Sequence, residues 1–159
     1  MHKLNLQDRE DINDSNLQTY LENGNYTKIN LSGTNIKNLS PFKNLTSLVS
    51  LHLSNTQVEN IEDLSGLINL KYLFLTSTLV YNIKSLENLT NLRELSLTDT
   101  KINFDLIPLT KLILLEKLYL NEVCIDSLSI LQLKTLTNLK VLEVDHTLRF
   151  AKQELIKNL

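Results

Sequence analysis

Cys124, combined with His52 or His146, is the one arrangement in this sequence that could form a nucleophilic pair. A catalytic cysteine needs a base within hydrogen-bonding reach. The repeat described below places Cys124 and His52 three repeats apart, about 14 Å at one strand spacing per repeat. His146 lies in the repeat next to that of Cys124, but two strand positions out of line. Because no other nucleophile and base come together, the sequence predicts that the protein is not an enzyme.

Asp99, Glu122 and Asp145 form an acidic column along the loop edge of the same repeats. Carboxylates can hold Ca²⁺, but the residue spacing of a dedicated calcium loop is absent here. The N-x-S/T triplets at 44–46 and 88–90 match the glycosylation pattern, yet they recur because the repeat itself reads NLT. We therefore predict no bound metal and no cofactor.

The composition restricts both the class of protein and its partners. A chain of 159 residues and 18.3 kDa with 42% apolar residues can bury one core. Its net charge of −2 supplies no basic field for nucleic acid or an anionic membrane, and no apolar run is long enough to span a bilayer. The single cysteine and the charged N-terminal residues, which do not resemble a signal peptide, favour a cytoplasmic location, with secretion by another route as the alternative.

An internal repeat organises most of the sequence. Its anchors follow one another at steps of 22, 22, 22, 23 and 24 residues, and they are Tyr26, Leu48, Leu70, Leu92, Leu115 and Leu139. Apolar residues recur three and five positions after each anchor, and a threonine follows in most copies, so that the frame reads LxxLxLxxTxI. A fixed period of this length indicates a solenoid of stacked coils.

The repeat also predicts the structure of one coil. The LxL pair has the period of a short strand, and the spacing of three that follows suits a 3₁₀ turn. Burying about seven side chains gives one coil roughly 10–20 kcal/mol, whereas ordering its backbone costs about 22–44 kcal/mol. One coil is therefore unstable alone, and the coils must stack on one another.

The phrases INLSGTNIKNLSPFKNLTSL, from Ile29 to Leu48, and LSLTDTKINFDLIPLTKL, from Leu95 to Leu112, resemble the leucine-rich repeat family. The resemblance is to the 22-residue form of internalin-like bacterial proteins and of phosphatase-regulating proteins. It implies an α/β fold: a right-handed solenoid or horseshoe with a parallel, concave β-sheet. The family usually has asparagine at the ninth position of the repeat, where this chain has threonine and, once, Val123. We expect a threonine ladder that is partly satisfied by the backbone and that ends at Val123.

Both ends of the solenoid are predicted to be covered by helices. Residues 1–25 are expected to form an N-terminal cap helix started by Asp11 or Asp14, residues 26–150 six leucine-rich repeats, and residues 151–159 a C-terminal cap helix. In the C-terminal helix, Phe150, Leu155 and Leu159 are expected to face inward. The extra residues of the two longer repeats are expected in the convex loops.

The strand positions that do not enter the core form columns across the concave surface. Phe74 is a large apolar ring at a position that should face solvent, next to Tyr72 and His52. Such a patch marks an interface, or else the rings only pack on one another. The charged positions toward the C-terminus give a solvated face or orient a partner, and Glu94 is expected to pair with Lys117. The predicted partner-binding residues are His52, Tyr72, Phe74, Glu94, Lys117, Tyr119 and Glu143.

These observations predict a monomeric, non-catalytic module that binds a protein partner on its concave surface. One alternative is a structural or sensing repeat segment of a larger bacterial protein, which would use this surface for packing. The other is a secreted or effector-type virulence factor that binds a host protein, an interpretation that depends on the internalin-like resemblance alone.

Overall fold

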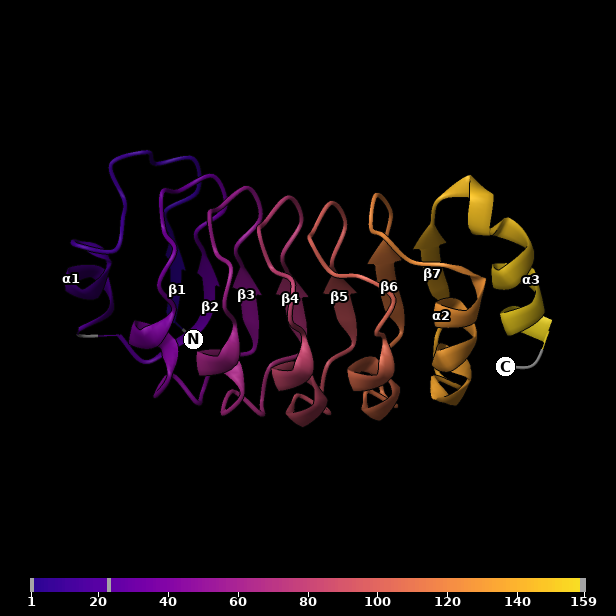
Figure 1. The fold of residues 1–159 in the computed structure, drawn as a ribbon. Helices are drawn as coiled ribbons and strands as arrows, with labels where there is room; N and C mark the ends of the chain where they lie inside the picture. Colours follow the sequence, from indigo (N-terminus) through magenta and orange to yellow (C-terminus); the bar gives the residue numbers. More distant parts are fainter. Residues whose placement is uncertain (1, 23, 158–159) are drawn as a thin grey trace.

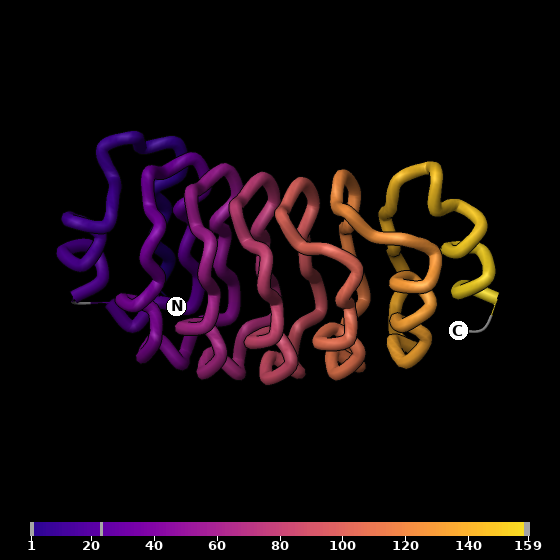
Figure 2. Tube along the Cα trace, viewed as in Figure 1, coloured from indigo at the N-terminus to yellow at the C-terminus, as the bar shows by residue number. Residues whose placement is uncertain are grey.

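The computed structural model describes residues 2–22 and 24–157, and these residues form one row of stacked coils (Figures 1 and 2). Within them, each coil contributes one short strand to a parallel sheet in the order β1 to β7. The strands are β1 His2–Asn5, β2 Tyr26–Asn30, β3 Ser50–His52, β4 Tyr72–Phe74, β5 Glu94–Ser96, β6 Lys117–Leu120 and β7 Val141–Val144. The sheet is open at both edges, as the predicted solenoid requires.

Short helical segments form the layer opposite the sheet, and α-helices also lie at the two ends of the row (Figure 1). The 3₁₀ segments are η1 Ser40–Phe42, η2 Glu62–Leu64, η3 Lys84–Asn88, η4 Ile107–Lys111, η5 Gln132–Thr135 and η6 His146–Leu148. The α-helices are α1 Leu17–Leu21, α2 Ser127–Leu131 and α3 Arg149–Lys157. The 3₁₀ segments confirm the turn that the spacing of three predicts. The face of the sheet turned away from them is called the concave surface below (Figure 1).

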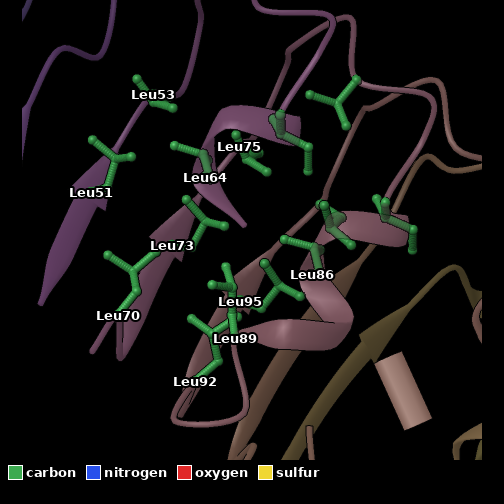
Figure 3. Packing of buried hydrophobic residues seen from close by; sticks show 14 of the residues in the cluster. Leu51, Leu53, Leu64, Leu70, Leu73, Leu75, Leu86, Leu89, Leu92 and Leu95 are labelled. Carbon is green, nitrogen blue, oxygen red and sulfur yellow. The ribbon is translucent and has the colours of Figure 1, made fainter. Parts of the chain in front are cut away.

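The core lies between these two layers and runs continuously through the array. Leu51, Leu73 and Leu95 are opposite one another in register on adjacent strands, and each is fully buried. Figure 3 shows these side chains among the leucines of the 3₁₀ segments, including Leu64 and Leu86. Each coil thus covers the apolar edge of the next, and the stacking predicted from the repeat is confirmed.

The buried threonines satisfy their hydroxyl groups within their own coil. Thr78 Oγ1 donates a hydrogen bond of 2.7 Å to the carbonyl oxygen of Leu75. Thr34, Thr56 and Thr100 make the same bond to the residue three positions earlier. The expected series is therefore satisfied by the backbone, and Val123, which has no hydroxyl group, interrupts it.

An asparagine ladder between coils is present, but at the turn that leads into each strand. Asn91 Nδ2 donates to the Ile68 carbonyl oxygen of the preceding coil at 2.9 Å. Asn69 and Asn138 make equivalent bonds at 2.9 and 2.8 Å. Leu114 occupies the same position in its coil and breaks this ladder.

We expect Leu114→Asn to add the missing rung. The new amide lies opposite the Thr90 carbonyl, and one added hydrogen bond should raise the free energy of unfolding by about 0.5–1 kcal/mol. Leu114→Asp is the matched control, since its carboxylate has the same shape but no N–H to donate. Urea denaturation followed by circular dichroism measures both. Equal stability of the two variants would contradict the expectation that the asparagine hydrogen bonds between coils stabilise the fold.

The N-terminal segment contains more than the predicted cap helix. β1 extends the sheet by a seventh strand, with Leu4 opposite Ile29. Leu6 and Ile12 are buried in the same core as the later repeats. The residues after β1 loop out into α1 and return to β2, and this longer coil hides the repeat in the sequence.

Two details of the predicted caps are wrong. Asp14 does not cap α1: its Oδ1 accepts the backbone N–H groups of Lys37 and Asn38, while Asn16 holds the N-cap position. Phe150 faces solvent, with 84% of its surface exposed, because α3 begins at Arg149 and turns Ala151 and Leu155 inward. The burial of Leu155 is confirmed, and Leu159 lies outside the described residues.

The extra residues of the longer coils lie outside the sheet, as predicted. Phe104 is exposed and has a positive φ of 34°, a conformation that side chains rarely adopt. In the next coil the insertion forms α2, where Asp126 caps the helix by accepting the N–H of Ser129 at 2.8 Å.

Candidate functional site

All seven residues predicted to bind a partner lie on the concave surface, from β3 to β7. They fall into two adjacent columns. One column aligns Tyr72, Glu94 and Lys117 on successive strands. In the other, His52 is opposite Phe74, and Tyr119 is opposite Glu143.

The rings of His52 and Phe74 stack on each other. Their centroids are 4.4 Å apart and their planes make an angle of 29°, while both side chains remain partly exposed. His52 Nε2 also lies 3.1 Å from Ser50 Oγ, and Ser50 is buried. The packing of these rings is confirmed, and the stack offers a fixed apolar platform at the surface.

The environment of His52 favours its neutral form. Burial lowers the pKa of His52 below its ordinary value, and the positive charge of Lys28 lowers it further. Glu94 acts weakly in the opposite direction. At neutral pH the imidazole is therefore an uncharged ring that can both donate and accept a hydrogen bond.

Tyr119 is separated from the stacked rings. Ser96 lies between Phe74 and Tyr119 in the same column, and its short side chain is buried. The Tyr119 hydroxyl group instead donates a long hydrogen bond of 3.4 Å to Glu94 Oε1. The structure thus brings His52 and Phe74 together and joins Tyr119 to the charged part of the surface, and Tyr72 lines a small cavity with Glu94 and Lys117.

The charged part of the surface is paired within itself. Lys117 Nζ lies 3.3 Å from Glu94 Oε2, which confirms the predicted pair. Glu116 bridges Arg93 at 2.8 Å and Lys140 at 2.7 Å. The Lys140 and Arg93 hydrogen bonds lower the pKa of Glu116, and the bond to Glu94 raises the pKa of Lys117. Exposed pairs of this kind stabilise a fold by less than about 1 kcal/mol each.

Sequence reasoning missed the part of the concave surface that β1 adds. A cavity of about 240 Å³ lies over β1, β2 and β3, and its lining includes Lys3, Lys28, Asn30, Ser50 and His52. The signal that could have found it is Leu4-Asn5-Leu6, an LxL pair before the first recognised repeat.

A larger cavity, of about 590 Å³, lies away from the concave surface, along η3 and η4. Its lining includes Tyr81, Ile107 and Pro108. The exposed residues Leu79 and Phe104 lie in the same loops as the lining residues. None of the residues predicted to bind a partner lines it.

The other candidate residues stay apart from this surface. Cys124 is exposed and pairs through its backbone with Asn103 in an isolated bridge. The Asp145 side chain of the acidic column accepts the backbone N–H of Glu122 at 3.1 Å, whereas the equivalent N–H of Asp99 is accepted by the backbone carbonyl of Asn121 in the next coil. Among residues 2–22 and 24–157, no three His, Cys, Asp or Glu side chains gather as metal ligands, and no helix is both long and apolar enough to cross a membrane.

An open parallel sheet with one short strand per coil and 3₁₀ segments on its other side defines a leucine-rich-repeat solenoid. The family model for leucine rich repeats (2 copies) matches residues 25–66. A comparison with curated protein sequences finds no match.

Several solved structures share the fold. Internalin C2 from Listeria monocytogenes is 31% identical with a TM-score of 0.70, and the alignment covers 80% of this chain and 65% of that one. A second L. monocytogenes internalin, InlF, is 27% identical with a TM-score of 0.62, and the alignment covers 82% and 44%. TLR13, solved in a complex with ssRNA13, is 29% identical with a TM-score of 0.67, and the alignment covers 81% and 20%.

The chain has the leucine-rich-repeat fold, and the family-model match and the similarity to internalin C2 are consistent with an internalin-like bacterial type. It spans less than two thirds of the length of either internalin. The fold is typical of modules that mediate protein–protein interactions, and proteins of this family are typically not enzymes.

Proposed function

We propose that this chain is a non-catalytic module that binds a protein partner on its concave surface. The stacked pair of His52 and Phe74 carries the proposal, because it keeps aromatic area partly exposed in the middle of the sheet. Aromatic anchors dominate the binding energy of protein interfaces. Tyr72 and Tyr119 enlarge the aromatic area, and Glu94, Lys117 and Glu143 supply charged flanks that orient the partner.

The mechanism is preorganisation. Each strand of the concave surface is fixed by the core leucines beneath it, and Leu73 and Leu95 are fully buried under Tyr72, Phe74 and Glu94. A surface that is already ordered loses little conformational entropy when a partner docks. The partner therefore meets a rigid sheet, and its own ordering dominates the cost of association.

The charge of the chain favours a protein over a nucleic acid as this partner. The structural relative TLR13 is described in a complex with ssRNA13. This chain, however, has a net charge of −2, and beside β5 to β7 the cations Arg93, Lys117 and Lys140 are engaged in ion pairs with carboxylates. Binding a phosphate backbone needs free cations all along the contact, whereas the lysines without an ion pair on the described strands are Lys3 and Lys28, both at the N-terminal end of the sheet.

The test compares capture by three forms of the immobilised chain from a lysate of the organism that makes it. Combining Tyr72→Ala with Phe74→Ala should weaken capture of the bound protein at least tenfold, since central aromatic anchors contribute about 2 kcal/mol or more. Tyr81→Ala is the matched control, because Tyr81 is 57% exposed and lies off the concave surface.

Two outcomes would contradict the proposal. Capture that persists in the folded Tyr72→Ala, Phe74→Ala variant would place the binding site elsewhere. Self-association of the wild type in size-exclusion chromatography, lost in this variant, would favour the alternative in which the surface packs within a larger assembly. Circular dichroism of each form establishes that it is folded.

A further inference from the structure

Two lysines face each other at the N-terminal end of the concave surface. Lys3 on β1 and Lys28 on β2 are direct register partners, and both are exposed. Among the residues that the structure describes, neither lysine takes part in an ion pair. Like charges directly opposite in a sheet destabilise it, so this pair has a cost that the fold itself does not offset.

The rest of the surface shows how such charges are otherwise handled. Lys117 on β6 is paired with Glu94 on β5, and Arg93 and Lys140, which immediately precede β5 and β7, share Glu116. The strands β1 to β4 contain no aspartate or glutamate. Lys3 and Lys28 are therefore available to a negatively charged group outside the chain. Placing two like charges opposite each other without compensation is an unfavourable arrangement of the kind that is expected at functional sites.

The surroundings of the two lysines suit a carboxylate. They line the cavity of about 240 Å³ together with Asn30, Ser50 and His52. The Ser50 hydroxyl group and the His52 ring are hydrogen-bonded to each other at its wall. Lysine ammonium groups make charge-assisted hydrogen bonds with carboxylates, about twice as strong as neutral ones.

The aromatic platform lies at a useful distance from the lysine pair. Phe74 on β4 is two strands from Lys28 on β2 and two residues further along the strand direction, which together correspond to about 12 Å. An extended peptide covers this distance with about three residues. One segment crossing the strands can therefore place an acidic residue at the lysines and an apolar residue on the His52–Phe74 stack.

We propose that the N-terminal half of the concave surface, from β1 to β4, binds an acidic segment of the protein partner. Its carboxylates pair with Lys3 and Lys28, and an apolar side chain about three residues away lies on His52 and Phe74. This inference rests on the proposed function and adds the chemistry of the segment that is bound.

Two synthetic peptides test it by NMR titration of the ¹⁵N-labelled full chain. The acidic probe is acetyl-Glu-Glu-Ser-Phe-amide, and its uncharged counterpart carries glutamine in place of both glutamates. We expect the acidic peptide to shift the amide signals of Asn30, Ser50 and His52. The glutamine peptide should bind at least tenfold more weakly, because it lacks the charges that pair with the lysines.

Variants of the chain separate this site from general electrostatic attraction. Lys28→Glu should weaken binding of the acidic peptide at least tenfold. The stability of the fold should stay constant or rise, because Lys3 then faces a carboxylate. Lys43→Glu changes the net charge equally at an exposed position next to η1, off the sheet, and should leave binding unaltered.

Equal affinity for the two peptides, shifts confined to β5–β7, or no binding of the acidic peptide would each overturn the inference. None of these results decides the proposed function, which the capture experiment with Tyr72→Ala and Phe74→Ala tests separately. Loss of capture in that variant together with equal peptide affinities would leave a concave binding surface that does not select acidic segments.

Discussion

Replacing Leu95 with alanine is expected to lower the free energy of unfolding by about 3 kcal/mol, within the range for fully buried leucines. Leu95 lies on β5 in the middle of the array, between Leu73 and Leu118 in register, and none of its surface is exposed. The side chain fills space for its own coil and for both neighbours. A cavity at this position therefore weakens two interfaces between coils.

Leu79→Ala provides the matched control, since it removes the same atoms from a side chain that is 45% exposed. Its cost should be below about 1 kcal/mol. Urea denaturation followed by far-ultraviolet circular dichroism compares the two variants. Equal losses would mean that stacking of the coils is not what stabilises the fold, and the account of the repeat would have to be abandoned.

The repeat could be predicted because its positions recur with their environment. An LxL pair followed by threonine indicates the same strand and turn in each coil. Because Leu51, Leu73 and Leu95 occupy the same position of this pattern, burial of one predicts burial of the others. The segments without a repeating environment could not be read in this way. Phe150 is an example, since its orientation depends on where α3 begins, and helix boundaries are poorly determined by sequence.

In the candidate site, too, the features that belong to the regular repeat could be predicted, and those outside it could not. The register of the repeat was enough to predict the pairing of Glu94 with Lys117 and the contact of His52 with Phe74. Lys28 could be placed on the concave surface from its repeat, but its like-charged neighbour Lys3 could not. That neighbour is revealed only when β1 joins the sheet, because 25 residues separate Leu4 from Ile29 and the regular step is 22.

The N-terminal coil gives the second large effect, and Ile12→Ala tests it. Ile12 is fully buried, and its carbonyl oxygen accepts the backbone N–H of Asn35 in the next coil at 2.9 Å. If this coil is an integral part of the array, the substitution should cost about 2–4 kcal/mol. Ile156→Ala removes the same atoms from a side chain that is 54% exposed, and it should cost less than about 1 kcal/mol.

Hydrogen exchange separates an integral coil from a detachable cap. The amides of Leu6 and Asp8 donate to the carbonyls of Asn30 and Ser32, and they should exchange faster in Ile12→Ala. The Leu97 amide, bonded to Tyr119 far along the array, should show a smaller change, because coils interact mainly with their neighbours. Unaltered exchange at Leu6 and Asp8, with an unaltered urea midpoint, would mean that β1 adds no stability. The lysine pair would then lie on an edge strand that opens freely. A rigid surface for an acidic segment therefore requires that Ile12→Ala lower the free energy of unfolding.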